Sequence, residues 1–308
     1  MRLAVFSDVH SNHHALKACL KEAEKQKADG YIFLGDYISD CANPHETMKL
    51  IYRAKQEMPC WFVRGNREEY VLNHHNFGSD WANGTTTGSL LYTYEGLTAE
   101  DLEFISALPF MQTIDPNGKC PIRICHGSPE KTRDTLRPFS YKIESWLLKI
   151  DERVLLSGHT HQPCSAHTMG KLYVNPGAVG VQCTQTVTAK MALLESDGNT
   201  WNETLLEVPY DIDAAALEIR ESGLLTRAGV WGHAILKQLY TGKNYSLFCV
   251  QRAEELAAGG PVLLEHWQQA ARDFGMNTRP ARRLNNRSIS RNRPRRTAGP
   301  FRHTRISP

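Results

Sequence analysis

The stretch LAVFSDVH at residues 3–10 decides the fold class of this chain. Its first four residues form a short apolar run typical of a buried strand, and the run leads into an Asp-x-His triplet. A segment with apolar residues at helical spacing, from Ala15 to Ala23, follows directly. The order strand, loop, helix predicts an α/β architecture.

Similar short apolar runs recur, with predicted helices between several of them. They lie at residues 31–34, 61–63, 122–125, 154–156 and 172–174. Buried strands that alternate with helices are typical of an α/β sheet. Residues 189–195 and 201–208, separated by Asp197-Gly198-Asn199, predict a β-hairpin that closes this sheet or a second one.

The charges divide the chain into an acidic body and a basic tail. The 308 residues carry a formal net charge of +3, but ten of the 36 Lys and Arg lie after residue 273, where no acid occurs. Residues 1–273 therefore carry a net charge of about −7. Residues 277–308 combine Arg, Asn, Ser and Pro with few apolar side chains, and we expect them to be disordered.

The cysteine pattern and the lengths of the apolar runs bear on location. Eight cysteines without a C-x-x-C pair are too sparse for a secreted, disulfide-stapled scaffold, so we expect a cytoplasmic protein. Every apolar run is far shorter than the roughly 20 residues that cross a bilayer, and we expect neither a membrane span nor a signal peptide.

Metal-ligating residue types follow five of the predicted strands. They are Asp8, His10, Asp36, Asn66, His126, His159 and His161. Because the carboxyl ends of strands in an open α/β sheet lie along one rim, we expect these side chains to gather in one place. Helix capping and turn formation do not explain why all five segments have the same position after an apolar run.

The ligand types predict a site for two metal ions. We expect residues 8–10 to be extended, so that Asp8 and His10 point to the same side and hold one ion together, and His159 and His161 share that spacing. A mixture of carboxylate, amide and imidazole ligands suits Mn²⁺, Fe or Zn²⁺. Glycines at positions 35, 65, 127 and 158 let the backbone turn sharply next to the ligands.

Taken in order, the motifs D-x-H, G-D, G-N-x-E, H-G and G-H-x-H resemble the calcineurin-like metallophosphoesterases. The chain is most similar to compact bacterial predicted phosphodiesterases of that superfamily, in which N-P-G, here residues 175–177, and I-R-E-S-G-L, here residues 219–224, also recur. The resemblance implies an α/β (α+β) fold, a four-layer α/β/β/α sandwich. Residues 1–208 would be the catalytic domain, 209–276 a helical C-terminal extension, and 277–308 the Arg-rich tail.

The resemblance also implies a cofactor and a reaction. Asp8, His10 and His161 would hold one divalent ion, Asp36 would bridge two, and Asn66, His126 and His159 would hold the second. Mn²⁺ is the first expectation, with Fe, Zn²⁺ or Ni²⁺ as alternatives. A hydroxide bridging the two ions would attack phosphorus in line in a phosphodiester or phosphomonoester.

The resemblance further assigns roles around the metals. It implies catalytic roles for Asp36, Arg67 and His126, and substrate binding by Asn12, Asn66 and Arg67. The loop cations Arg64, Lys131, Arg133 and Arg137 are further candidates to orient the phosphate.

Arg67 departs from the family pattern, since many members have a histidine at this position. An arginine stays protonated near neutrality, so it cannot act as a general acid, although it can stabilise negative charge. Either the substrate has a good leaving group that needs no proton, or the proton comes from metal-bound water or from a nearby histidine. The candidate histidines are His13, His14, His45 and His74.

Two other functions stay open at this stage. A scaffold protein of the same superfamily binds partners with little or no catalysis, and the Arg67 departure keeps that function possible here. Alternatively, the basic tail could make the protein a nuclease, although an acidic body repels a polyanion. We expect a small phosphorylated substrate, no nucleic acid except through the tail, and allow for a homo-oligomer.

Overall fold

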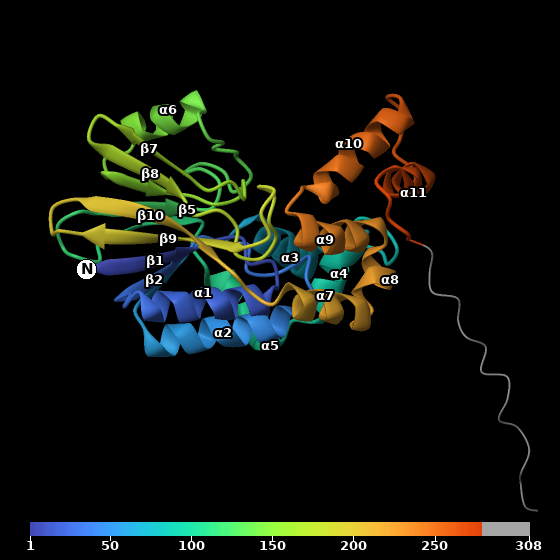
Figure 1. Ribbon diagram of the computed structural model, residues 1–308, viewed down its shortest axis with the longest axis horizontal. Coiled ribbons are helices and arrows are strands. Elements are labelled where there is room, and N and C mark those ends of the chain that lie inside the picture. The colour runs from blue at the N-terminus through green and yellow to red at the C-terminus, as the bar shows by residue number, and fades with distance from the viewer. Residues whose placement is uncertain (279–308) are drawn as a thin grey trace, which may run out of the picture. The chain divides into compact units, whose positions relative to one another are not determined.

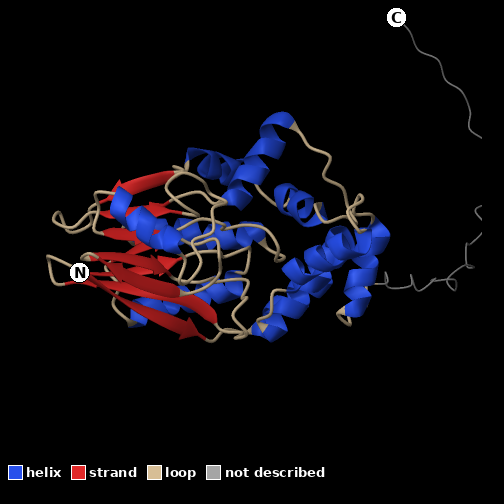
Figure 2. Cartoon of the chain, turned by 90° about the horizontal axis from the view of Figure 1, so that it is seen from above, coloured by secondary structure: helices blue, strands red, loops and turns tan. Residues whose placement is uncertain are grey.

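Two five-stranded sheets stack face to face in the centre of the molecule, and helices cover both outer faces (Figures 1 and 2). The computed structural model describes residues 1–278, which form one compact unit. The tail predicted to be disordered, residues 277–308, lies outside the described residues from residue 279 onward. No helix within residues 1–278 is both long and apolar enough to cross a bilayer.

The first sheet has the strand order β10-β9-β1-β2-β3. Three parallel strands, β1 (Arg2–Phe6), β2 (Gly30–Phe33) and β3 (Cys60–Phe62), carry the first three motifs. The predicted hairpin is confirmed as β9 (Ala189–Ser196) and β10 (Trp201–Val208), and β9 pairs antiparallel with β1.

The second sheet has the strand order β4-β5-β6-β8-β7. Its parallel centre consists of β5 (Ile122–Cys125), β6 (Val154–Leu156) and β8 (Lys171–Asn175). The edge strands are β4 (Met111–Ile114), which pairs antiparallel with β5, and β7 (Cys164–Thr168), which pairs antiparallel with β8. Both are more exposed than the central strands. Their mixed polar sequences explain why the apolar runs alone did not predict them.

Successive side chains of β1 pack alternately into two different hydrophobic cores. Leu3 and Val5 face the second sheet and pack in a buried cluster with Ile122 and Leu156, whereas Phe6 faces the opposite way toward the outer helices. The helices α1 (His13–Lys25) and α2 (Pro44–Glu57) cover the first sheet, and α6 (Tyr141–Lys149) covers the second. The predicted four-layer sandwich is therefore confirmed.

The remaining helices lie mostly toward one end of the sandwich (Figure 1). They are α3 (Asn66–Phe77), α4 (Gly88–Glu95), α5 (Ala99–Ala107), α7 (Ile212–Glu221), α8 (Leu224–Ala228), α9 (Val230–Thr241), α10 (Tyr245–Ala257) and α11 (Leu264–Asp273). The exception is α5, whose Phe104 packs against Tyr52 of α2 and Phe62 of β3. Helix α4 packs against α8 and lies in the segment at residues 76–96. The segment is helical there because it buries one face, including Leu90.

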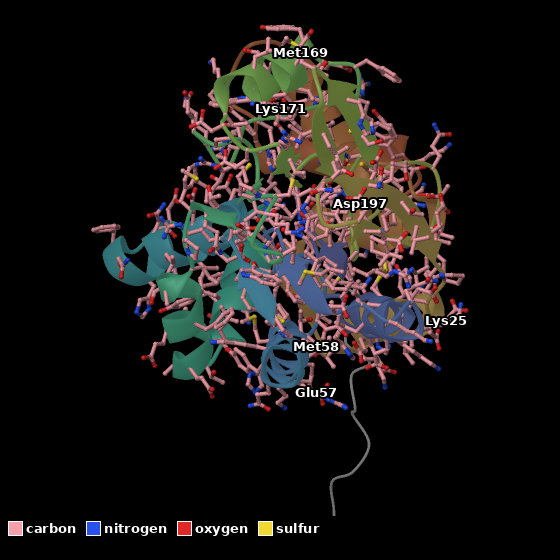
Figure 3. The ribbon with its side chains drawn as sticks, turned by 90° about the vertical axis from the view of Figure 1, so that its left-hand side faces the viewer. Lys25, Glu57, Met58, Met169, Lys171 and Asp197 are labelled. Carbon is pink, nitrogen blue, oxygen red and sulfur yellow. The ribbon has the colours of Figure 1, made fainter. Side chains whose placement is uncertain are left out.

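The two rims of the sandwich differ in content. Figure 3 looks onto the rim at which the parallel strands begin, where Lys25 and Met58 lie at the ends of helices and Met169 and Asp197 lie in hairpin turns. The motif residues lie at the other rim, toward which α7–α11 are placed (Figure 1).

Candidate metal centre

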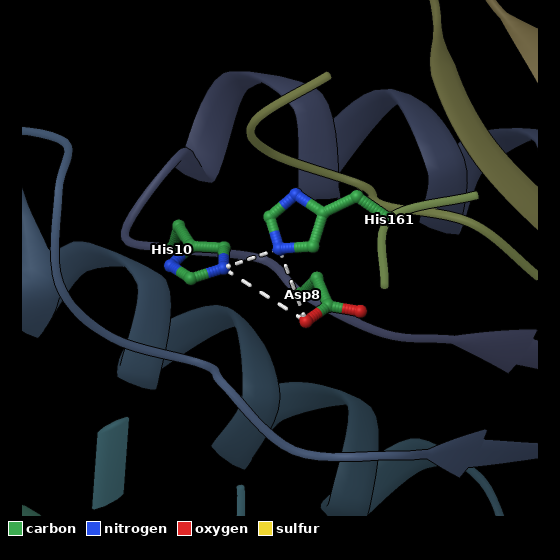
Figure 4. A group of neighbouring side chains, drawn as sticks. All are labelled: Asp8, His10 and His161. Atoms are coloured by element: carbon green, nitrogen blue, oxygen red, sulfur yellow. Dashed lines mark hydrogen bonds and ion pairs between the residues drawn. The ribbon is translucent and has the colours of Figure 1, made fainter. Parts of the chain in front are cut away.

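The structure brings all seven predicted ligands together at the carboxyl ends of the parallel strands. They form two groups, in each of which the ligand atoms lie within 4.8 Å of one another. One group comprises Asp8, His10 and His161 (Figure 4). The other contains Asp36, His126 and His159, and Asn66 lies beside His126.

The first group is a tight cluster of two imidazoles and a carboxylate (Figure 4). The Nε2 atoms of His10 and His161 are 3.1 Å apart. Asp8 Oδ1 lies 3.4 Å from His161 Nε2 and 3.9 Å from His10 Nε2. Asp8 is completely buried, and its Oδ1 has no hydrogen-bond partner.

The Nδ1 contacts of His10 and His161 show which kind of group fits between their Nε2 atoms. His161 Nδ1 donates to the carbonyl oxygen of Val181 at 2.6 Å, and His10 Nδ1 lies 3.1 Å from Asp40 Oδ2. In the neutral rings, both Nε2 lone pairs therefore point at each other and at the unpartnered Asp8 Oδ1. Such an arrangement of acceptors is stable only around a cation, so these residues fit a divalent metal ion.

In the second group, a hydrogen bond at Nδ1 likewise orients the Nε2 atom of a histidine. His126 Nδ1 donates to the carbonyl oxygen of Leu34 at 2.7 Å, which directs Nε2 toward Asp36 Oδ2 at 3.5 Å and Asn66 Oδ1 at 3.2 Å. Asp36 Oδ2 is also 3.7 Å from His10 Nε2. Asp36 therefore lies between the two groups, at the position from which one carboxylate can contact two ions.

Backbone conformation at the ligands differs from the extended geometry that the sequence predicted. Asp8, His10, Asp36, His159 and His161 all have positive φ, between 48° and 65°. These left-handed residues follow the strands rather than continue them, so the period-two argument for residues 8–10 is wrong. Hydrogen bonds between the loops, from Asp8 N to Gly35 O and from His10 N to Asp36 O, stabilise this uncommon conformation.

The motif glycines serve two different needs. Gly35 has φ +95°, which only glycine adopts readily. Gly65 has φ −99°, but a Cβ there would lie 2.2 Å from Asp36 Oδ1. The predicted sharp turn is therefore limited to Gly35, whereas Gly65 lets a metal-site carboxylate approach its backbone.

Glu68 holds two ligand loops together, a role that was not predicted. Its buried carboxylate accepts hydrogen bonds from the backbone N–H groups of Gly65, Asp36 and Tyr37, at 2.7, 2.8 and 2.9 Å. Burial, reinforced by the Asp36 carboxylate, raises the pKa of Glu68 to about 7. The sequence signal was present in the G-N-x-E spacing, which places a glutamate at the third position of α3.

Asp40 is a second unpredicted residue, and it joins three side chains. Its Oδ2 lies 3.1 Å from His10 Nδ1 and 3.1 Å from Arg67 Nη2. Its Oδ1 accepts a hydrogen bond from Trp231 Nε1 of α9 at 2.8 Å. One carboxylate therefore orients a metal ligand and Arg67, and links both to the C-terminal helices.

A cleft of about 910 Å³ opens over the ligands. Its lining includes His10, Asp36, Asn66, Arg67 and His159. These five residues are thus accessible to a ligand of considerable size, whereas the fully buried Asp8 and His126 do not line the cleft.

Asn12 does not belong to this lining, contrary to its predicted role in substrate binding. Its Oδ1 accepts a hydrogen bond from Ala15 N at the start of α1, and its Nδ2 donates to the Gly180 carbonyl oxygen. Asn12 is 1% exposed. Its polar atoms cap a helix and tie two loops, so substrate binding by Asn12 is corrected to a structural role.

The four histidines considered as proton donors also lie elsewhere. His13 and His14 contact Glu218, His45 contacts Asp101, and His74 stacks on Trp81. None of the four is among the described residues that line the cleft. The prediction that one of them protonates the leaving group is therefore not supported by their positions.

Metal-stripped protein is expected to lose stability as the pH rises above 6.5. Burial alone would lower the pKa of His126, but Asp36 and Asp8 outweigh it and raise this pKa to about 10. At His161, burial likewise lowers the pKa, but the Asp8 carboxylate outweighs burial, so the pKa of His161 is also raised. A raised histidine pKa stabilises the fold fully below the unfolded value of about 6.5, and this contribution is lost toward pH 10.

The melting temperature of stripped and Mn²⁺-loaded protein, measured from pH 6.5 to 9, checks this expectation. The gap between the two is expected to widen with pH, because bound metal replaces the lost protons. Burial lowers the pKa of His159 to about 4, so its contribution changes only below this window. Equal pH slopes for both forms would contradict the assignment of a shared proton and metal site.

The chain resembles known proteins in sequence and in structure. The family model described as the calcineurin-like phosphoesterase superfamily domain matches residues 1–199. Protein MJ0912 of Methanocaldococcus jannaschii is 27% identical over 237 residues, which are 72% of this chain and 93% of its own.

Two crystal structures resemble the chain over most of its length. A metallophosphoesterase from Sphaerobacter thermophilus is 24% identical, with a TM-score of 0.63, and the match covers 79% of this chain and 99% of that one. Hypothetical protein PH1004 from Pyrococcus horikoshii is also 24% identical, with a TM-score of 0.67 and coverage of 78% and 98%. At this identity, the two structures support the fold alone.

Proposed function

The chain belongs to the calcineurin-like phosphoesterase superfamily, and on that basis we propose that it hydrolyses a phosphodiester or phosphomonoester with two divalent metal ions. The observation that carries the proposal is the pair of facing Nε2 atoms of His10 and His161, 3.1 Å apart beside the unpartnered Asp8 Oδ1. Asp36 lies between this group and the second one, which supports a dinuclear centre. We propose Mn²⁺ as the physiological ion.

When bound, the two ions supply Lewis-acid chemistry, activating water for in-line attack on phosphorus and offsetting charge on the phosphoryl oxygens. Asp8, His10 and His161 would hold one ion, and Asn66, His126 and His159 the other, with Asp36 shared. Asp40 and Glu68 keep these ligands in place through the hydrogen bonds described above.

Arg67 is the proposed phosphate-binding side chain. It lines the cleft, and its backbone N–H donates to Asp36 Oδ1 at 2.8 Å, which fixes it beside the shared ligand. Its Nη2 donates a hydrogen bond to Asp40 Oδ2 at 3.1 Å, while its buried Nε has no hydrogen-bond partner. Arg67 lines the cleft beside the shared ligand, where a guanidinium group can donate charge-assisted hydrogen bonds to a phosphoryl oxygen.

Replacing Arg67 with glutamine is expected to lower kcat/KM by about 10- to 100-fold, since a charge-assisted hydrogen bond contributes roughly 1.5–3 kcal/mol. Metal content is expected to stay at two ions per chain. Arg64→Gln is the matched control, because Arg64 lies three residues away, outside the described lining of the cleft. Steady-state kinetics in which the two variants lose equal activity would refute the role of Arg67.

The proposed activity is tested with bis-p-nitrophenyl phosphate and p-nitrophenyl phosphate. Metal-stripped protein is expected to be inactive and to regain turnover when Mn²⁺ is restored. The ratio of the two rates then ranks diester against monoester chemistry. If neither ester is hydrolysed while elemental analysis finds two bound metals, the general hydrolase proposal fails and a scaffold function gains support.

We propose a small phosphorylated molecule as the substrate and the cytoplasm as the location. The eight free cysteines, five of them buried, suit a reducing compartment. The net negative charge of residues 1–273 supports a small substrate over a long polyanion.

A further inference from the structure

We propose that helices α9 and α10 and the loop at residues 127–140 form a second anion-binding wall of the metal cleft. The substrate would then be a phosphate ester that carries a second phosphate group and a planar ring, as phosphorylated nucleosides do. The inference rests on the proposed function, because the first phosphate is taken to lie at the metal centre.

The cleft is larger than a single phosphate group requires. Its volume of about 910 Å³ is typical of a pocket for a ligand of several ring and chain units. One side is formed by the metal ligands and Arg67, and the other by residues of α9 and α10, among them Trp231, Gln238 and Phe248. The space beyond the metals therefore belongs to the part of the substrate that does not react.

The charged side chains that line this part of the cleft are positive. Arg133, Arg137 and Lys243 line the cleft, and none of them forms a salt bridge with another residue of the described chain. The carboxylates in the described lining are Asp36 and Asp40, and both are engaged at the metal centre. Three uncompensated cations in a concave surface create a positive potential that attracts a second anionic group.

The wall is fixed in place before any ligand binds. Trp231 Nε1 donates to Asp40 at 2.8 Å, and the Arg67 guanidinium lies 5.8 Å from the Trp231 ring centre. Further along α9, Gln238 Nε2 donates to the Gln182 carbonyl oxygen at 2.7 Å, and Gln238 is buried. Two hydrogen bonds, one buried and one partly buried, therefore anchor α9 to the loops of the metal centre, which lowers the ordering cost of binding.

The apolar part of the lining suits a planar ring. Besides Trp231, it includes Ile235, Leu247, Phe248 and Val250 from the same two helices. Phe248 is held edge-on by Tyr245, with ring centres 5.6 Å apart. Apolar and aromatic side chains next to cations match a ligand with a base or aryl group beside a phosphate.

Calorimetric titration of the Mn²⁺-loaded full chain with two nucleotides tests the inference. Adenosine 3′,5′-bisphosphate and adenosine 5′-monophosphate differ only by one phosphate, and ³¹P NMR verifies that each stays intact. We expect the wild type to bind the bisphosphate at least about tenfold more tightly, the gain typical of one charge-assisted contact. Arg137→Gln and Lys243→Gln are each expected to lose most of this preference.

Lys119→Gln removes the same charge from an exposed lysine just before β5, at the opposite rim, and is expected to keep the full preference. Equal binding of the two nucleotides by the wild type would overturn the inference. So would a preference that survives in the triple variant Arg133→Gln, Arg137→Gln, Lys243→Gln.

The two proposals can fail separately in the wild type. Turnover of the p-nitrophenyl esters without a preference for the bisphosphate overturns only the anion-binding wall. A preference without turnover overturns only the proposed hydrolysis.

Discussion

Asp36→Asn is expected to reduce Mn²⁺-dependent ester hydrolysis by about a thousandfold, at the upper end of the losses seen when one electrostatic contact to the transition state is removed. Asp36 Oδ2 lies 3.7 Å from His10 Nε2 and 3.5 Å from His126 Nε2, so one carboxylate serves both ligand groups. An amide at this position is neutral and offers one oxygen. It cannot balance the charge of two cations.

The change should leave the fold intact, because an asparagine Oδ1 can still accept the hydrogen bond from Arg67 N. Circular dichroism and metal analysis on the same sample separate these effects, with fewer than two ions per chain expected. Asp29→Asn is the matched control, since Asp29 accepts a hydrogen bond from Arg2 N at the other rim. A variant that binds two ions and keeps turnover within tenfold of the wild type would rule out a bridging Asp36.

Glu68→Ala is expected to have the largest effect on stability, lowering the free energy of unfolding of the metal-loaded protein by roughly 3–6 kcal/mol. The carboxylate is completely buried and accepts three backbone N–H groups. Each buried donor left without a partner costs about 1–3 kcal/mol. In stripped protein the loss should be smaller, because the variant relieves the repulsion between Glu68 and Asp36, which adds to burial in raising the pKa of Glu68.

Glu68→Gln guards against a variant that does not fold. It keeps the shape, but its NH₂ group must face one of the three donors, so we expect an intermediate loss and weaker metal binding. Glu69→Gln is the control, since that side chain is partly exposed and accepts from Thr132 Oγ1. Urea unfolding measures the free energy of unfolding of each variant. A value for Glu68→Ala within about 1 kcal/mol of the wild type would contradict the stabilising role of Glu68.

The sequence predicted the elements that bear the ligands, because each motif follows an apolar run and parallel strands end at one rim. It did not predict the conformation of the ligands themselves. Asp8 and His10 have positive φ, a state set by hydrogen bonds between loops that are distant in sequence. Residue type alone allows that state without requiring it.

Contacts between distant segments also explain the other differences. Asp40 meets Trp231 across 191 residues, and Asn12 meets Gly180 across 168. Neither pairing leaves a periodic pattern in the sequence, so the linking role of Asp40 was missed and Asn12 was assigned to the substrate. Glu68 did leave a signal, since a glutamate three residues after Gly65 can accept a hydrogen bond from the N–H group that precedes α3.

The central claim is that two metal ions at these seven residues drive ester hydrolysis. Its most direct test is to titrate Mn²⁺ into stripped full-length protein while measuring bound Mn²⁺ and the hydrolysis of bis-p-nitrophenyl phosphate and p-nitrophenyl phosphate in the same samples. The account predicts that hydrolysis of at least one ester rises with metal and saturates at two ions per chain. Full occupancy without hydrolysis of either ester, or hydrolysis that does not depend on added metal, would contradict it.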